Sequence, residues 1–507
     1  MLRFPPRGAL IALNLAFIVV LLGSEPCRAQ EPKANSAVAF AGPRGTTPPP
    51  AVDSSPGTRN GGTIQTSGAK GQSAPAVAPA SNTDFVKTAD QVLAQMSGIL
   101  SLPVKKPLKK SLRSRQQIRD YLIEQEKDDK DPKKRYADQR ALVAFGLIPH
   151  GFPLESFLLD LLTDQIAGLY DSKAREFYIA DWMAPEDQKP VMAHELTHAL
   201  DDQYYHIDTW EKAARPNDDA ESAREAVLEG SALAAMFDYT LAPEKMSVRN
   251  FGDIASLIDQ QALDEAEKDP VMVKAPQFIK DDLLFPYVAG AGFTQQFLKA
   301  TNGWADFHKV FENPPVSTQQ ILHPEMYFAG IRPPPLELPK VKPILPHGWK
   351  ELDQNVMGEY GLKEVLKQFL GADSAARLSP EWAADRYSIS ESQDKQQTLL
   401  IFLVRLQHNE NAKTFFARYN ALLRKKYPAH TAVREQPFLM EWQTSTGAVG
   451  LECHEEECLA VEGADGAFFD RLVTALGWPA TPAAPAAEPP VGTIAQFLPS
   501  LRGRELN

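Results

Sequence analysis

The residues best suited to do chemistry lie in the stretch 191–203, VMAHELTHALDDQ, which contains His194, Glu195 and His198. In a helix, residues four apart lie on one face, so the imidazoles of His194 and His198 can bind the same zinc ion. Glu195 lies one step along the same turn, where it can take a proton from a metal-bound water. From 191 to 200 no other charged residue occurs, which indicates a buried helix rather than a surface helix with two chance histidines.

A tetrahedral zinc that keeps a water needs a third protein ligand. The candidates lie in the stretch 218–239, whose helical pattern has an apolar stripe and has Glu221, Glu225 and Glu229 recurring on one flank. Gly230 stands inside this helix, where glycine costs about 1 kcal/mol against alanine. We expect a glycine there because another backbone, such as that of the helix with His194, approaches closely. We therefore favour Glu229 as the third ligand, with Glu225 as the alternative.

These motifs carry a family resemblance. His194-Glu195-x-x-His198 followed by Glu229-Gly230-Ser231-Ala232 resembles a zincin metallopeptidase of the gluzincin kind, in which a Glu-Gly-x-Ala element on a second helix supplies the third ligand. The glutamate lies 31 residues past the second histidine (229 − 198), farther than in thermolysin or the aminopeptidases, so the resemblance is to the clan. It implies an α+β fold with a mostly helical zincin-like domain, a small β-sheet, and hydrolysis of peptide bonds.

The stretch that follows the two helices also resembles exported bacterial proteins with the same first helix, which are predicted zinc peptidases. The shared elements run from Phe285-Pro286-Tyr287 to Tyr327. The mechanism needs a side chain that donates a hydrogen bond to the developing oxyanion. We consider His323 and Tyr327 the candidates, with Tyr287 behind them; a histidine before proline is otherwise a structural turn residue.

A hairpin is predicted just before the first motif. The β-prone pieces Ala167–Tyr170 and Glu176–Ala180 flank the turn residues Asp171–Lys173. In metallopeptidases the free edge of such a hairpin can pair with the backbone of an extended substrate. The alternative is a purely structural hairpin.

The first 29 residues are typical of a cleaved signal peptide, with Arg3 and Arg7 before an apolar stretch and Cys27-Arg28-Ala29 at the cleavage site. We therefore expect a periplasmic or secreted protein, or one anchored in the membrane if this segment stays uncleaved. Residues 30–83 are rich in Ala, Pro, Gly and Ser and predict a disordered tether, and residues 481–507 predict a disordered tail.

The remaining chain divides into two folded parts. Residues 84–332 form the expected zincin-like metallopeptidase domain, 333–348 a proline-rich linker, and 349–480 a small α+β domain without a catalytic constellation. After export Cys453 and Cys458 remain as a pair. They flank a turn between two short strands, which predicts a local disulfide. A metal site using His454 is the alternative.

The 507 residues exceed one ordinary core, in agreement with two domains. A net charge of −12 without basic clusters argues against nucleic acid as a partner. The resemblance to metallopeptidases implies a peptide or protein substrate. The sequence thus predicts an exported zinc metallopeptidase with His194, His198 and Glu229 as ligands and Glu195 as general base. The rivals are a non-catalytic envelope binding or scaffold protein that retains zinc, and a zinc aminopeptidase. The sequence predicts no oligomeric state.

Overall fold

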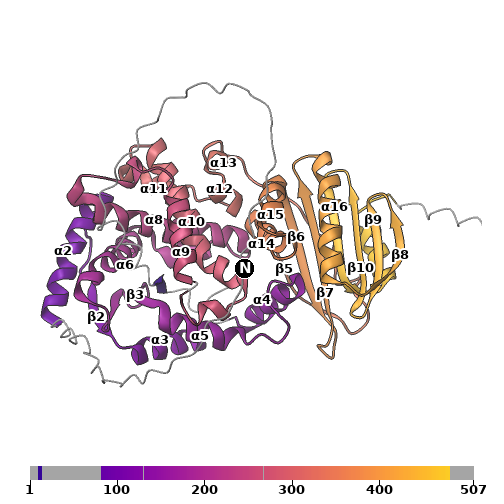
Figure 1. Cartoon of the computed structure of the whole chain (residues 1–507), viewed down its shortest axis with the longest axis horizontal. Coiled ribbons are helices and arrows are strands. Elements are labelled where there is room, and N and C mark those ends of the chain that lie inside the picture. The colour runs from indigo at the N-terminus through magenta and orange to yellow at the C-terminus, as the bar shows by residue number, and fades with distance from the viewer. Residues whose placement is uncertain (1–8, 14–81, 129–130, 267, 480–507) are drawn as a thin grey trace, which may run out of the picture.

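The computed structural model describes residues 9–13, 82–128, 131–266 and 268–479 (Figure 1). Helices arranged around a small sheet form the first half, and a seven-stranded antiparallel sheet with covering helices forms the second. The expected α+β class is confirmed. Within the described residues, no helix is long and apolar enough to span a membrane. The predicted signal peptide, tether and tail lie outside the described residues, except for Ala9–Leu13 and residues 82–83, which begin a helix instead of ending the tether.

The first half contains the helices that surround the histidine motif. In chain order they are α2 (Asn82–Leu100), α3 (Arg115–Asp128), α4 (Pro132–Phe145), α5 (Leu154–Gln165), α6 (Pro185–Tyr205), α7 (Ile207–Lys212), α8 (Asp218–Leu241), α9 (Ile254–Ala266), α10 (Gln277–Ala300), α11 (Trp304–Glu312), α12 (Thr318–Leu322) and α13 (Pro324–Phe328). Three short 3-10 turns join them, at Ala242–Glu244, Val248–Asn250 and Met272–Lys274.

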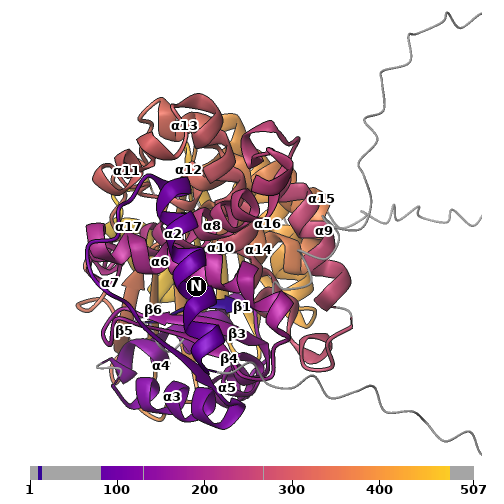
Figure 2. The ribbon, with the colours of Figure 1, turned by 90° about the vertical axis from the view of Figure 1, so that its left-hand side faces the viewer.

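The small sheet supports the histidine helix. Its strands are β1 (Ala9–Leu13), β2 (Lys109–Arg113), β3 (Ile166–Asp171) and β4 (Glu176–Ala180), in the order β1-β3-β4-β2. β3 and β4 form the predicted hairpin, with Gly168 opposite Ile179. The sheet lies between two cores: one face packs against α3 and α5, and the other packs against α2 and α6 (Figure 2).

The second half is built on the large sheet, in the order β5-β6-β7-β11-β10-β9-β8. Its elements are β5 (Lys350–Asn355), α14 (Gly358–Leu370), α15 (Ala372–Leu378), a 3-10 turn (Ser379–Glu381), β6 (Trp382–Glu391), β7 (Thr398–Leu406), α16 (Asn409–Lys426), β8 (His430–Gln436), β9 (Leu439–Thr444), β10 (Gly447–His454), β11 (Glu457–Ala464) and α17 (Gly466–Ala475). Helices α14 and α16 lie on one face of the sheet, and α17 lies on the other.

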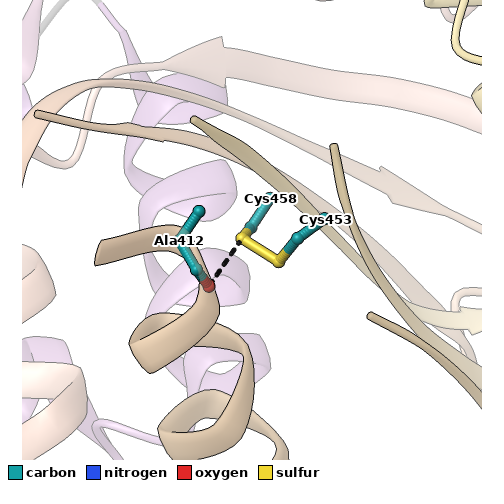
Figure 3. The surroundings of a disulfide bond; sticks show 3 residues. All are labelled: Ala412, Cys453 and Cys458. Atoms are coloured by element: carbon teal, nitrogen blue, oxygen red, sulfur yellow. Dashed lines mark hydrogen bonds between the residues drawn. A yellow bond between two sulfur atoms is a disulfide. The ribbon is translucent and has the colours of Figure 1, made fainter. Parts of the chain in front are cut away.

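The predicted disulfide between Cys453 and Cys458 is present. The two residues face each other across the β10–β11 hairpin, with Cα atoms 4.0 Å apart. Figure 3 shows the bridge beside α16, where the Sγ atom of Cys458 lies 3.7 Å from the carbonyl oxygen of Ala412. A disulfide is compatible with an exported protein.

The two halves share a hydrophobic core. Apolar residues of α4, α5 and α10 pack into the same cluster as one face of the large sheet, so Phe145 contacts both Tyr387 and Phe402 edge-on. The proline-rich segment 333–348 has neither helix nor strand, but Leu336, Leu338 and Val341 are buried against the opposite face of the sheet. The segment expected as a linker is therefore packed on the second half through these side chains.

Candidate metal centre

Two helices bring together the three predicted ligands. His194 and His198 lie on α6 and Glu229 on α8. The Nε2 atom of His194 lies 3.1 Å from both Glu229 Oε2 and His198 Nε2, and His198 Nε2 lies 3.6 Å from the same carboxylate oxygen. All three side chains are buried. They form a group that could hold a metal ion.

The donor set fits a tetrahedral ion. Bonds of about 2.0–2.1 Å to a tetrahedral zinc place two ligand atoms about 3.3 Å apart. The observed separations of 3.1, 3.1 and 3.6 Å lie around this value. Burial lowers the pKa of His194, which keeps its imidazole neutral and able to donate a lone pair. The Nδ1 atoms of both histidines have no hydrogen-bond partner within the described residues, so no carboxylate orients the rings from behind.

The carboxylate of Glu229 is held as an anion. Burial alone would raise its pKa, but the electrostatic interaction with His198 and the hydrogen bond with His194 lower that pKa to about 2. Glu225, the alternative ligand, lies one turn earlier on α8, is only partly buried and does not belong to the ligand group. The structure thus assembles the favoured glutamate rather than the alternative.

The small sheet holds α6 in place. Tyr170 of β3 donates a hydrogen bond to Asp202 of α6 over 2.9 Å, one turn beyond the histidine pair. At Gly168, a Cβ atom would lie 2.6 Å from the side chain of Val191 and 3.2 Å from that of Glu195. A glycine at this point of β3 therefore lets the strand lie directly against the motif.

A glycine-to-glycine crossing fixes α8. A Cβ atom on Gly230 would lie 2.0 Å from the backbone of Gly290 in α10, and one on Gly290 would lie 1.9 Å from the carbonyl oxygen of Ala226. The close approach predicted from Gly230 is present, but the suggested neighbour was wrong: the helix that approaches is α10, not α6. The crossing brings α10, with Tyr287, against the centre.

Two further side chains complete the centre. Glu195 is fully buried beside the histidines. Tyr287 stacks on His194 with ring centroids 6.1 Å apart, and its hydroxyl donates a hydrogen bond to Glu229. Burial raises the pKa of Tyr287 well above its usual range, and the charges of Glu229 and Glu195 raise it further. The phenol therefore stays protonated and available as a donor.

The two leading candidates for the oxyanion donor are engaged elsewhere. His323 Nε2 lies 2.8 Å from Glu359 of α14, and the hydroxyl of Tyr327 donates to the carbonyl of Asn313 over 2.8 Å. Tyr287, ranked behind them from the sequence, is the one that reaches the ligand group. The spacing of Tyr287 and Gly290 on one helix was the available signal, because a close helix crossing at Gly290 carries a side chain one turn earlier to the same contact.

The outer edge of the hairpin is covered. β1 pairs antiparallel with β3, with Ala12 opposite Gly168, and β1 also contacts α6. The other edge, that of β4, pairs with β2 in parallel register. The edge expected to be free beside the motif is therefore occupied by residues 9–13 of the same chain.

Comparison with known families reaches only the second half of the chain. A family model described as "Domain of unknown function (DUF8575)" matches residues 345–473, from just before β5 to α17. No curated protein and no solved structure matches the chain.

Proposed function

We propose that this chain is an exported, zinc-dependent metallopeptidase of the zincin type, with His194, His198 and Glu229 as metal ligands. The observation that carries the proposal is the convergence of two Nε2 atoms and one carboxylate oxygen within 3.6 Å, next to a buried glutamate that is not part of the ligand set. A structural zinc site usually has four protein ligands and needs no base beside it. Three ligands and a base are typical of a catalytic site.

Each side chain has a distinct task in this proposal. Bound zinc would lower the pKa of a water to around 7 and polarise the scissile carbonyl. Glu195 accepts the proton from the attacking water and delivers it to the leaving amine. Tyr287 is protonated beside the centre, so its hydroxyl can hold Glu229 in place or donate to the oxygen that gains charge.

The edge of β3 suits an extended peptide. β3 lies against Glu195 at Gly168, and the backbone of β1 already pairs with this edge in antiparallel register. We propose that a substrate takes the place of β1 by strand addition, in the form of the chain that remains after cleavage near Ala29. The main-chain hydrogen bonds would then hold the substrate along α6 beside the metal.

The test of peptidase activity compares the wild-type chain 30–507 with Glu195→Gln on a mixed peptide library, with zinc measured per chain. The expected result is one zinc in both proteins and a loss of cleavage of about 10²–10⁴-fold in the variant, the usual contribution of general acid–base catalysis. Stoichiometric zinc without cleavage by the wild type would instead indicate a non-catalytic binding protein. Equal cleavage by both would remove Glu195 from the mechanism.

The role of the β3 edge is tested with chains that start at different residues. A chain from residue 14 lacks only β1 and what precedes it, and a chain from residue 30 also lacks the rest of the predicted signal peptide. Both should cleave peptides faster than the full chain, and equally fast, because both expose the same edge. Equal rates for all three chains would show that β1 does not compete with substrate.

A further inference from the structure

A cavity lies at the end of the histidine helix, away from the candidate metal ligands. It has a volume of about 330 Å³ and is bounded by the last turn of α6, the end of α2 and helix α11. Its walls are largely aromatic, with rings contributed by Tyr204, Tyr205, Trp304, Phe307 and Phe311. One carboxylate, that of Asp201, lines the same cavity.

Asp201 has no partner among the described residues. Its side chain is 4 % exposed, yet it makes no hydrogen bond and no ion pair within the part of the chain that the structure describes. Burying a carboxylate without a partner costs several kcal/mol unless something in the site compensates it. Burial, together with the neighbouring charge of Asp202, raises the pKa of Asp201 well above its usual range. The cavity therefore presents a poorly compensated acidic group.

The negative potential has a second source. α6 ends at Tyr205, has no basic residue in its last turn, and directs its carbonyl dipoles toward the same end. Asp201 and Asp202 thus lie at the unfavourable end of the helix for a carboxylate. The ammonium of Lys105 lies 3.3 Å from the ring centroid of Tyr204, but it forms no ion pair with Asp201 in the described chain.

The aromatic walls, in contrast, are held by contacts of their own. Trp304 donates its indole N–H to Asp238 over 2.7 Å, and the hydroxyl of Tyr204 donates to the carbonyl of Pro103 over 2.7 Å. Tyr205 stacks on Phe311 with centroids 3.9 Å apart. The rings are therefore held in place around the cavity, whereas the carboxyl group of Asp201 has no hydrogen-bond or ion-pair partner among the described residues.

We propose that this cavity binds an organic ammonium cation, with Asp201 as the counter-charge and the aromatic rings as the walls. Aromatic faces attract alkylammonium groups through their quadrupole, and a buried carboxylate adds charge pairing. The same chemistry can come from a free alkylammonium compound or from a lysine side chain of a peptide. The site does not depend on the metal centre.

The experiment measures binding of choline to the full chain by calorimetry, beside 3,3-dimethylbutan-1-ol, the neutral carbon analogue of choline. Choline should bind at least about tenfold more tightly than the alcohol, because only choline gains from the rings and the carboxylate. Nα-acetyl-lysine amide distinguishes a peptide lysine from a free alkylammonium compound. Equal affinity for choline and the alcohol, or no binding of choline and of the lysine amide, would overturn the proposal.

Variants assign the binding to the named residues. Asp201→Asn should weaken choline binding at least about tenfold, and Phe307→Leu severalfold, while both leave the alcohol unchanged. Asp187→Asn, at the other end of α6, should bind choline like the wild type. Without ligand, Asp201→Asn should melt no lower than the wild type, because it replaces a buried carboxyl group that has no partner among the described residues by a neutral group of the same shape. A lower melting temperature together with unchanged choline affinity would make Asp201 a structural residue.

The metal-free variant Glu229→Gln separates this proposal from the peptidase proposal. It should still bind choline with wild-type affinity, since neither the rings nor Asp201 belong to the ligand group. Loss of choline binding in this variant would contradict the independence of the two sites, whereas failure of cleavage alone leaves the cation site standing.

Discussion

At the scale of single residues, the pairing of the two candidate histidine ligands could be predicted from the sequence, because residues four apart in a helix lie on one face. His194 and His198 needed no tertiary information to be paired. Glu229 needed one inference, that a glycine after it marks a close approach, and the structure assembles this glutamate with the histidines. Tyr287 could not be ranked first, because its place depends on how α10 crosses α8 in three dimensions.

The choice between the two glutamates can be tested by metal content. Glu229→Gln should lose bound zinc, because it replaces the negatively charged carboxylate, one of three candidate ligands whose atoms lie within 3.6 Å of one another, by a neutral amide. Glu225→Gln is the matched control: it lies one turn away on the same helix and should keep one zinc per chain. Retention of zinc by the first variant and loss by the second would transfer the ligand role to Glu225.

At the scale of elements, the hairpin before the motif and the helices around 191–203 and 218–239 were predicted closely, but polar edge strands were not. β5 (KELDQN) and β8 (HTAVREQ) are the two edges of the large sheet, and β2 (KKSLR) is an edge of the small one. Charged edges discourage pairing with other chains. They also remove the alternating apolar pattern by which a strand is recognised, so these three segments show no strand signal in the sequence.

The crossing of α8 and α10 predicts opposite effects for two glycine substitutions. Gly230→Ala should lower the free energy of unfolding by at least about 1–3 kcal/mol, because the added Cβ would meet backbone atoms of Gly290 that cannot turn away. Gly98→Ala in α2 is the control. Nothing lies within 4 Å of its added Cβ, so it should raise stability by about 0.5–1 kcal/mol. Urea unfolding of both variants checks this, and equal effects would contradict the crossing.

At the scale of the whole molecule, the two predicted domains follow each other along the chain, but they do not have separate hydrophobic cores. The core that joins α4, α5 and α10 to the large sheet could not be read from the sequence, because periodicity shows which face of an element is apolar but not what covers it. The same holds for Lys134. It lies in a stretch dense in charged residues, 124–135, a pattern typical of a solvated surface, yet it is buried between Asp138, Asp218 and Asp353 and joins α4, α8 and β5.

The junction between the halves also contains a buried acid that predicts a pH dependence. Asp219 of α8 accepts hydrogen bonds from the backbone N–H of Thr318 over 3.0 Å and from its hydroxyl. Burial raises the pKa of Asp219 to about 7. The charges of Asp385 and Glu359 also raise this pKa, whereas the hydrogen bonds from Thr318 lower it. The pKa in the folded state is thus above the unfolded value of 3.8.

Because folding raises the pKa of Asp219, its contribution to the free energy of unfolding is complete below pH 3.8 and is lost as the pH rises through 7. We expect the free energy of unfolding to fall by roughly 2–3 kcal/mol from pH 5 to pH 8 through this residue. Asp219→Asn should flatten that slope, as measured by urea unfolding at each pH. The exposed Asp373→Asn should keep it. A slope that is the same in all three proteins would show that Asp219 does not set it.

The glycine crossing has a consequence for how this sequence can change over time. At both positions the forbidden volume belongs to main-chain atoms, Gly290 for one helix and Ala226 for the other. A second substitution therefore cannot compensate for the first, because the obstructing atoms belong to the backbone and no smaller side chain would remove them. Of all the places near the candidate metal centre, we expect this pair to change least: relatives that keep His194, His198 and Glu229 should keep both glycines as well, since a Cβ at either position would push α8 and α10 apart beside Glu229.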